Sequence, residues 1–258
     1  MRLKGKVALV TGGCRGIGSG IAAAFAREGA RVAINYNSSA GAASELVKSI
    51  QEEKGEAISI QGDVGSAESV LSMIEKVTEE FGRIDILVNS AGTLSSAPVL
   101  ELDPNEVKRV FETNVFGLFT ISQLAAKKMV SQGDGGAILN ISSLVAFRPF
   151  LGASHYNASK AAVTSFTRSM ALELGRYRIR VNELCPASVE TDMIRKALQD
   201  PENVQMRRRT IPLGRIGTPE DLAGAAVYLC SDEASWITGV SIYTDGGLSV
   251  IPPFGPPS

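Results

Sequence analysis

The sequence predicts an α/β protein with a doubly wound parallel sheet of about seven strands and helices on both faces. Short apolar runs alternate with amphipathic helical patterns along nearly the whole chain, which is typical of βαβ units. The apolar runs show little polar alternation, as expected of strands that are buried on both sides of a parallel sheet. No internal repeat or linker interrupts this order, so we expect a single domain over residues 1–250 and a proline-rich tail at 251–258.

The first strand and the loop after it predict a dinucleotide site. The strand KVALVT covers residues 6–11, and TGGCRGIG leads from it into a helix expected at 17–28. Gly12, Gly16 and Gly18 have the spacing G-x-x-x-G-x-G, which differs from the more common G-x-G-x-x-G. Glycines let the backbone approach a pyrophosphate, and the helix N-terminus supplies amide donors and partial positive charge. This strand, loop and helix predict a Rossmann-like fold.

The end of the second strand indicates which dinucleotide is bound. This strand, RVAINY, covers residues 31–36, and Tyr36, Asn37 and Ser38 stand where an NAD site usually has a carboxylate. A carboxylate would repel a 2′-phosphate, whereas these polar groups and the Arg15 guanidinium in the glycine loop would hold it. We therefore expect NADP(H) as the cofactor. The same Asn-Ser-Ser stretch also suits a helix N-cap, and the two roles are compatible.

Two further βα units follow. We expect helices at 40–53 and 66–81 and strands at 57–61 and 83–92. Asp63 follows a strand, where its carboxylate could bind an adenine amino group or cap the next helix. Small residues end the 83–92 strand and leave room where open α/β sheets bind ligands. A long helix after Pro104 contains Asn114, a poor mid-helix residue whose amide we expect to bond backbone or water.

The second half of the chain completes the sheet. We expect strands at 137–143, 179–184 and 239–247, and helices at 153–175 and 219–230. Residues 190–212 are polar and rich in arginine, without a strong apolar face. This composition is typical of a substrate lid and equally of a solvated insertion.

Composition excludes several classes of function. Hydrophobic residues make up 44% of the 258 residues and the net charge is −1, which gives no electrostatic footprint for nucleic acid or an anionic membrane. Cys14, Cys185 and Cys230 are widely spaced and predict reduced thiols. The first apolar run is too short for a signal peptide, and no run reaches about 18 apolar residues. We expect a soluble cytoplasmic protein that acts on a small molecule and needs no metal.

Residues 142–160 hold the best candidates for chemistry. Tyr156 and Lys160 are four residues apart, so a helix would place the phenol and the ammonium on one face. A phenol titrates at about 10, and a nearby cation lowers that pKa, which makes the tyrosine a plausible general acid or base. Ser143, at the end of the preceding strand, could donate to a developing oxyanion. By itself the Tyr-Lys spacing also occurs by chance on amphipathic helices.

Motifs in the right order along the chain make it resemble the short-chain dehydrogenase/reductase family. They are TGGCRGIG, GDV, NSAG, ETNVFG, ISS followed by YNASK, PASVET and YTDGG, and they lie within residues 3–248. The resemblance is greatest to the branch that contains the 3-oxoacyl carrier-protein reductases. It implies hydride transfer between C4 of the nicotinamide and a carbonyl carbon, with the cofactor carrying the redox chemistry.

The resemblance implies four catalytic residues. Tyr156 would pass the proton, while Lys160 would lower the pKa of that tyrosine and hold the nicotinamide ribose. Ser143 would polarise the substrate carbonyl, and Asn114 would complete a proton relay through water.

The resemblance also implies where the cofactor lies. It places Asp63 and Val64 at the adenine, Asn89 near its ribose, and Val189 and Thr191 at the carboxamide. The expected cofactor contacts are Gly12, Arg15, Gly16, Ile17, Gly18, Tyr36, Asn37, Ser38, Asp63, Val64, Asn89, Ala91, Gly92, Tyr156, Lys160, Val189 and Thr191.

A few positions depart from the family pattern or stand beside it. Ser90 replaces the second asparagine of the usual Asn-Asn-Ala-Gly, and Ala187 replaces the glycine of the usual Pro-Gly turn. Cys14 occupies the glycine loop as a small residue. The single histidine, His155, precedes Tyr156 and is interpreted as a loop or rim residue, because adjacent helical positions point apart.

The leading functional interpretation is an NADP(H)-dependent ketoreductase that reduces a ketone to a secondary alcohol. Phe147, Phe150 and Leu151 indicate a partly apolar pocket wall. An NADP-dependent sugar or polyol dehydrogenase is the alternative, because ASHYNASK and the lid also resemble aldose dehydrogenases of the family. A non-catalytic NADPH-sensing regulator is an alternative of another class. Family members usually form homotetramers through the helices around 107–129 and 158–173 and the C-terminal strand, so we expect that assembly.

Overall fold

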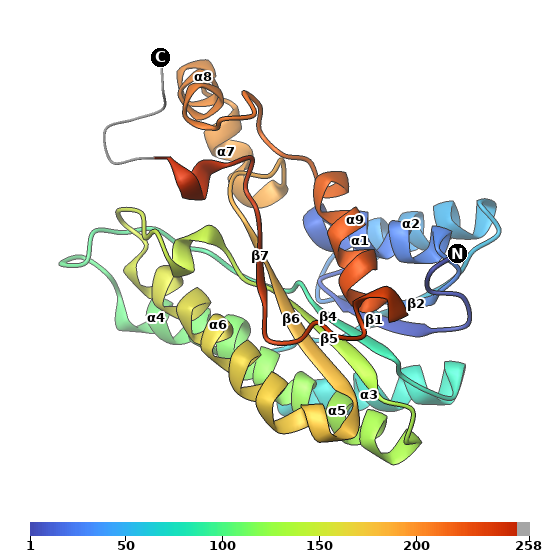
Figure 1. The fold of residues 1–258 in the computed structure, drawn as a ribbon. Coiled ribbons are helices and arrows are strands. Elements are labelled where there is room, and N and C mark those ends of the chain that lie inside the picture. The colour runs from blue at the N-terminus through green and yellow to red at the C-terminus, as the bar shows by residue number, and fades with distance from the viewer. Residues whose placement is uncertain (252–258) are drawn as a thin grey trace.

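The computed structural model describes residues 1–251, which form a seven-stranded sheet with helices on both faces (Figure 1). The strand order is β3-β2-β1-β4-β5-β6-β7, and every neighbouring pair is parallel. The strands are β1 (Val7–Thr11), β2 (Arg31–Tyr36), β3 (Glu56–Gln61), β4 (Ile86–Asn89), β5 (Gly136–Ile141), β6 (Ile179–Pro186) and β7 (Ser241–Thr244). This architecture confirms the predicted fold class. The expected proline-rich tail lies, from residue 252 onward, outside the described residues.

The helices follow the strands in the predicted order. They are α1 (Gly16–Arg27), α2 (Ala40–Glu52), α3 (Ala67–Phe81), α4 (Pro104–Phe111), α5 (Leu118–Gln132), α6 (Ser154–Leu174), α7 (Arg195–Leu198), α8 (Pro201–Thr210) and α9 (Pro219–Cys230). Within residues 1–251, no helix combines the length and the apolar character that crossing a membrane requires.

The first strand shows why both faces of the sheet are covered. Successive side chains of a strand point to opposite faces, and all the residues of β1 are buried. Ala8 and Val10 join an apolar cluster that includes Phe25 of α1 and residues of α9. Val7 and Leu9 join a second cluster, which contains residues of α3, α5 and α6. Burying each large apolar side chain contributes roughly 1.5–3 kcal/mol, so this two-sided pattern favours two helical layers.

Several helices begin at polar capping residues. The Ser66 hydroxyl accepts a hydrogen bond from the Ser69 amide at 3.3 Å, and α3 starts at the next residue. Asp103 caps α4, where Pro104 takes the first helical position. At α9, Thr218 and Asp221 form a reciprocal capping box. Each such cap supplies about 1 kcal/mol and determines where the backbone turns into a helix.

Several element ends differ from the sequence expectation; β7, for example, spans Ser241–Thr244 instead of 239–247. Strand β4 is shorter than the predicted 83–92, because Asp85 accepts from the Val7 amide before the strand begins. After the strand, the Ser90 and Ala91 amides leave the sheet and donate to the Thr11 hydroxyl at 3.1 Å. The long helix after Pro104 is divided by a π-helical segment at Glu112–Gly117, which contains Asn114.

The sheet reverses its winding between β1 and β4. From β1 the chain proceeds outward through β2 and β3, and it then returns to place β4 on the other side of β1. Loops leaving the carboxyl ends of these two strands therefore diverge and open a crevice. Residues 190–212 form a short 3₁₀ turn, α7 and α8, which lie above the same edge of the sheet (Figure 1).

Candidate active site

The glycine loop has the conformations that a phosphate-binding loop requires. Gly12 and Gly16 have φ values of +58° and +51°, which side chains with a Cβ rarely adopt. A Cβ on Gly18 would lie 2.4 Å from the Gly12 carbonyl oxygen, so this glycine lets α1 pack directly on the loop. The Gly12 amide donates to Asn35 Oδ1 at 3.2 Å, and Asn35 Nδ2 in turn donates to the Gly62 carbonyl at 2.9 Å. Asn35, near the end of β2, therefore fixes the position of the glycine loop through these hydrogen bonds.

The N-terminus of α1 is open to an anion. Arg15 stands at the N-cap with an extended backbone and makes no side-chain cap, and the first turn of α1, which includes Ile17, has no acid. The amides of this turn, with the helix dipole, favour a negative group such as a pyrophosphate. These features fit the predicted dinucleotide. The Arg15 guanidinium lies 3.5 Å from Asp192 Oδ2, and both side chains are substantially exposed.

The tip of β2 carries the polar groups that the sequence predicts. Tyr36 ends the strand, and the Asn37 carbonyl accepts from Gln61 Nε2 at 3.1 Å. Ser39 is the N-cap of α2, and its side chain makes no capping hydrogen bond. The hydroxyl at this cap therefore has no helix-capping role, and no carboxylate stands among residues 36–39.

The residues predicted at the adenosine end divide into two groups. Asp63 is exposed, and it accepts from the Gly65 amide at 2.8 Å; Ser66, rather than Asp63, caps α3. Val64, Asn89 and Ala91 line one narrow crevice beside Thr11 and Leu118.

The Asn89 side chain is held within the protein core. Its Nδ2 donates to Ser122 and to Asn140, each at 2.8 Å, and the side chain is only 3% exposed. Among the described residues its Oδ1 finds no donor. Asn89 therefore cross-links β4, α5 and β5.

The structure brings Ser143, Tyr156 and Lys160 together. Ser143 follows β5, and the other two lie one turn apart near the start of α6. Lys160 Nζ is 5.7 Å from the centre of the Tyr156 ring and donates to the Ile141 carbonyl at 2.8 Å. All three side chains are buried, with exposed fractions of 8% for Ser143 and Tyr156 and 6% for Lys160. A phenol, a hydroxyl and an ammonium in one buried site form a proton-transfer arrangement.

Burial determines the ionisation of this site. It raises the pKa of Tyr156 to about 12, and interaction with the Ser143 side chain partly opposes that rise. Burial also lowers the pKa of Lys160 to about 8, while the charge of the nearby Glu183 opposes the change. The sequence predicted that a neighbouring cation would lower the pKa of Tyr156, whereas burial raises it and only the Ser143 side chain opposes the rise.

Asn114 lies beside this site in the π-helical segment. Its Oδ1 accepts from the Thr93 amide at 2.8 Å, and its Nδ2 donates to the Thr93 carbonyl at 2.9 Å. The Nδ2 also donates to Ser159 of α6 at 3.1 Å. The prediction that its amide bonds backbone is therefore confirmed, and the loop after β4 is fixed against α6. Gly92, just before Thr93, borders Asn114 and Lys160, since a Cβ there would lie 3.5 Å and 3.8 Å from their side-chain atoms.

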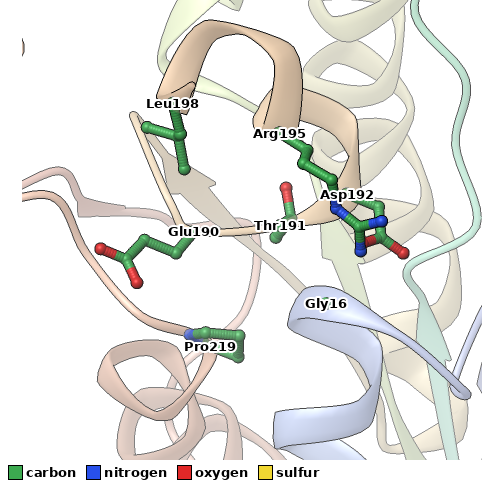
Figure 2. A pocket seen from close by; sticks show the side chains of 7 residues that line it. All are labelled: Gly16, Glu190, Thr191, Asp192, Arg195, Leu198 and Pro219. Carbon is green, nitrogen blue, oxygen red and sulfur yellow. The ribbon is translucent and has the colours of Figure 1, made fainter. Parts of the chain in front are cut away.

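A cavity of about 330 Å³ lies between the glycine loop and residues 190–198. Figure 2 shows the side chains around it, and the lining residues are Gly16, Glu190, Thr191, Asp192, Arg195, Leu198 and Pro219. Thr191 packs against the loop, because a Cβ on Gly16 would lie 3.0 Å from its Cγ2. Val189 is buried and forms a bridge with Gly217. Of the residues expected at the pyrophosphate and the carboxamide, Gly16 and Thr191 therefore line this pocket.

Two polar groups near the site were not predicted from the sequence. His155 is only 4% exposed, and its Nε2 lies 2.8 Å from Ser95 Oγ, so its interpretation as a rim residue is wrong. Folding of the loop after β4 onto the start of α6 buries it, and no pattern in that loop reveals the contact. Glu183 of β6 is fully buried. An acid on the strand face that otherwise carries Ile179 and Val181 is the signal that could have identified it.

Comparison with known proteins agrees with this geometry. Residues 12–249 match the sequence profile of a family described as enoyl-(acyl carrier protein) reductase. An L-rhamnose 1-dehydrogenase (NAD(P)(+)) from Sphingomonas is 39% identical over 248 residues, which are 96% of this chain and 98% of the relative. A 3β-hydroxysteroid dehydrogenase from Eggerthella lenta is 37% identical over 98% of this chain and 97% of its own length.

A solved dehydrogenase structure is also similar to this chain. The gluconate 5-dehydrogenase of Burkholderia cenocepacia, solved in complex with NADP and tartrate, has a TM-score of 0.92 and 33% identity. The match covers 97% of this chain and 98% of that protein. Together with the glycine loop and the serine, tyrosine and lysine site, these similarities identify the family. The chain belongs to the short-chain dehydrogenase/reductase family of NAD(P)-dependent oxidoreductases.

Proposed function

We propose that the protein uses NADP(H) to interconvert a secondary alcohol of a sugar or polyol with the corresponding carbonyl compound. The observation that carries the proposal is the buried Ser143, Tyr156 and Lys160 site beside the polar Ser95–His155 pair. The first three residues supply the chemistry. Ser95 and His155 provide polar groups beside these three residues, where the hydroxyl groups of a sugar could bind.

The catalytic roles follow from the chemistry of each group. The bound nicotinamide supplies or accepts the hydride. Tyr156 gives a proton to the carbonyl oxygen during reduction and removes it from the alcohol during oxidation. Ser143 orients that oxygen through its hydroxyl. Lys160 favours the phenolate when it carries its proton, and Asn114 holds the Thr93 backbone of the loop that faces α6.

The preference for NADP(H) rests on the charge around the tip of β2. Residues 36–39 offer hydroxyl and amide groups and no carboxylate, and Arg15 stands at the start of α1. A guanidinium binds a phosphate in a bidentate manner, whereas a carboxylate at this position would repel it. Residues 190–212 act as the substrate lid in this proposal. Asp192 from that segment is the present ion-pair partner of Arg15.

A polyhydroxylated substrate suits the loop after β4. Ser96 Oγ and the Ala97 amide bond the Gly152 carbonyl, which holds the loop against the turn before α6. The loop presents Ser95, and Thr93 accepts from Arg109 at 2.6 Å. Such directional donors and acceptors discriminate substrates by their hydroxyl groups. The similarity to an L-rhamnose 1-dehydrogenase and to a gluconate 5-dehydrogenase supports this class.

A ketoreductase for an apolar ketone is the second candidate. The Phe150 and Tyr156 rings are 6.5 Å apart, and Phe150 is 44% exposed. Phe147 and Leu151 are also exposed on the same segment, and such a wall suits a hydrophobic substrate. The 37% identity to a 3β-hydroxysteroid dehydrogenase supports this candidate.

One assay distinguishes the candidates. Reduction of NADP⁺ is measured with aldoses, aldonates and hydroxysteroids, and oxidation of NADPH with β-ketoesters and diketones. Tyr156→Phe serves as the control throughout. Turnover of aldoses or aldonates that is lost in the variant supports the sugar dehydrogenase, whereas turnover of apolar ketones or steroids alone favours the ketoreductase. NADPH binding without turnover of any compound would contradict both and favour the NADPH-sensing regulator.

A further inference from the structure

Glu183 is a fully buried acid at a position where the strand pattern requires an apolar residue. Strand β6 alternates between the two faces of the sheet, and Ile179 and Val181 belong to the apolar cluster on the α6 side. Glu183 and Cys185 continue this face, and both are 0% exposed. An ionised carboxylate without hydration is costly unless hydrogen bonds or a nearby cation stabilise it.

Hydroxyl groups from two elements surround the Glu183 carboxylate. Ser241 Oγ of β7 donates to Oε1 at 2.6 Å, and Thr164 Oγ1 of α6 donates to Oε2 at 3.1 Å. Thr167 Oγ1 is also within 3.4 Å of Oε2, although its proton is better directed to the Val163 carbonyl. The carboxylate is therefore held as an acceptor between α6 and β7.

The same contacts lead from Glu183 to Lys160. Thr164 and Lys160 are one turn apart on α6, so they share a face of the helix. Thr164 Oγ1 lies 3.2 Å from Ser142 Oγ, and the Ser142 hydroxyl donates either to that oxygen or to the Lys160 carbonyl, also at 3.2 Å. Ser142 also directly precedes Ser143. A short polar chain thus connects Glu183 with the backbone of two residues of the proposed active site.

Lys160 needs a negative group because it is itself buried. Its Nζ donates to the Ile141 carbonyl, and among residues 1–251 no carboxylate lies within 4 Å of it. Burial lowers the pKa of Lys160 to about 8, and the charge of Glu183 is the main influence in the opposite direction. Charge interactions in a dry interior act over longer distances than at the surface.

Other ionisable groups near Glu183 do not replace it as the counter-charge. Burial, reinforced by Glu183, raises the pKa of the Cys185 thiol, which stays neutral at physiological pH. Burial also raises the pKa of Tyr243 on β7. The charged groups that act on Tyr243 from α6 and from the end of β7 are Arg168 and Asp245.

We propose that Glu183 is a positioning residue. From its place between β6 and α6, its carboxylate keeps Lys160 protonated and fixes the turn of α6 that carries this lysine. The catalytic meaning of this role rests on the proposed function, in which the charged lysine favours the phenolate of Tyr156. The role itself is a property of the folded chain and is measurable without turnover.

The test is an NMR titration of Lys160 in full-length protein labelled with ¹³C at the lysine ε-carbons, with and without NADPH. The Lys160 signal is assigned by its loss in Lys160→Arg. In Glu183→Gln, which keeps the shape and removes the charge, we expect the titration midpoint of Lys160 to fall by about one pH unit. If this variant does not fold, Glu183→Met removes the same charge at similar volume.

Two matched variants separate charge from packing. Ser241→Ala removes a hydrogen bond to the carboxylate and retains its charge, and Asp85→Asn removes a buried carboxylate that precedes β4 and pairs with Arg83. Neither is expected to move the Lys160 midpoint. An unchanged midpoint in Glu183→Gln, or an equal shift in either control, would overturn the proposal. If the midpoint falls but no substrate is turned over, the role of Glu183 stands and the proposed reaction fails.

With an active substrate, a second readout follows from the same variant. The basic limb of the kcat/KM profile should move to lower pH by the same amount as the Lys160 midpoint, because the neutral amine no longer favours the phenolate. A uniform fall of kcat/KM at all pH values, without a shift of this limb, would indicate a packing role only.

Discussion

The ammonium nitrogen of Lys160 lies 5.7 Å from the centre of the Tyr156 ring, and more than nine-tenths of each side chain is buried. Burial moves the two pKa values in opposite directions, to about 12 for the phenol and about 8 for the ammonium. Both shifts favour the neutral forms. In the proposed mechanism, proton transfer by Tyr156 therefore depends on groups that keep Lys160 protonated.

Tyr156→Phe removes the proposed proton donor and leaves the ring in place. We expect turnover to fall by about 100-fold or more, because general acid–base catalysis contributes on that scale. Stopped-flow or steady-state measurement of NADPH absorbance checks this, with NADPH affinity as the control for an intact cofactor site. Turnover close to that of the parent would exclude Tyr156 from the chemistry.

The free energy of unfolding should depend on pH through Lys160. Its pKa in the folded protein, about 8, is below its ordinary value of 10.5, so the unfolded chain binds more protons between these values. Stability from this group therefore rises as pH increases from about 8 to 10.5. Lys160→Met removes the buried ammonium, so the variant should be more stable than the parent near pH 8. The difference between their free energies of unfolding should shrink by a few kcal/mol between pH 8 and 10.5.

Urea denaturation of the two proteins at several pH values measures this difference. The raised pKa of Cys230 has burial as its main cause and does not depend on Lys160, so this group should contribute equally to both proteins. A difference between parent and variant that is independent of pH from 8 to 10.5 would contradict the assignment.

Arg15→Ala should weaken NADPH binding by about tenfold and change NADH binding little, since one charge-assisted contact to the 2′-phosphate is lost. Calorimetric titration with both cofactors gives the affinity ratio. Asp192→Asn is the matched control, because it removes the ion-pair partner of Arg15 and should leave the ratio unchanged or raise it. An unchanged ratio in Arg15→Ala would remove this residue from cofactor selection.

Gly18→Ala should destabilise the protein by about 1–3 kcal/mol, because the new methyl group would lie 2.4 Å from the Gly12 carbonyl oxygen. Gly224→Ala, in the exposed face of α9, meets nothing within 4 Å and should stabilise by about 0.5–1 kcal/mol. Thermal unfolding of both variants provides the comparison. If both substitutions changed the stability equally, the effect would come from helix propensity alone, and the predicted clash at Gly18 would be contradicted.

We propose a homotetramer whose contact includes aromatic residues of the π-helical segment, α5 and α6. Phe116 is 60% exposed, and Phe119 packs on Phe166 with their ring centres 5.1 Å apart. Phe116→Glu should reduce the oligomeric state, because a charge would be buried in the contact. Sedimentation velocity measures the change. Leu71→Glu on α3, a similarly exposed apolar position, should leave the assembly intact.

Much of the fold was predictable because it depends on local patterns. Apolar runs without alternation identified strands with both faces buried, and the glycine loop after the first strand identified the ligand edge of the sheet. The spacing of Tyr156 and Lys160 on one helix also follows from local geometry. Element ends were less predictable: β4 stops at Asn89 because the following amides bond Thr11, a residue distant in sequence.

The sequence by itself determined the order of strands and helices, the glycine loop and the identity of the serine, tyrosine and lysine, since these depend on short-range periodicity and recognisable motifs. Only the tertiary structure decided what surrounds these groups. It buried His155 against Ser95, paired Arg15 with Asp192 and placed the Glu183 carboxylate against α6, the helix that carries Lys160. It also reversed the expected direction of the Tyr156 pKa, because hydration is lost only when distant segments close over the side chain.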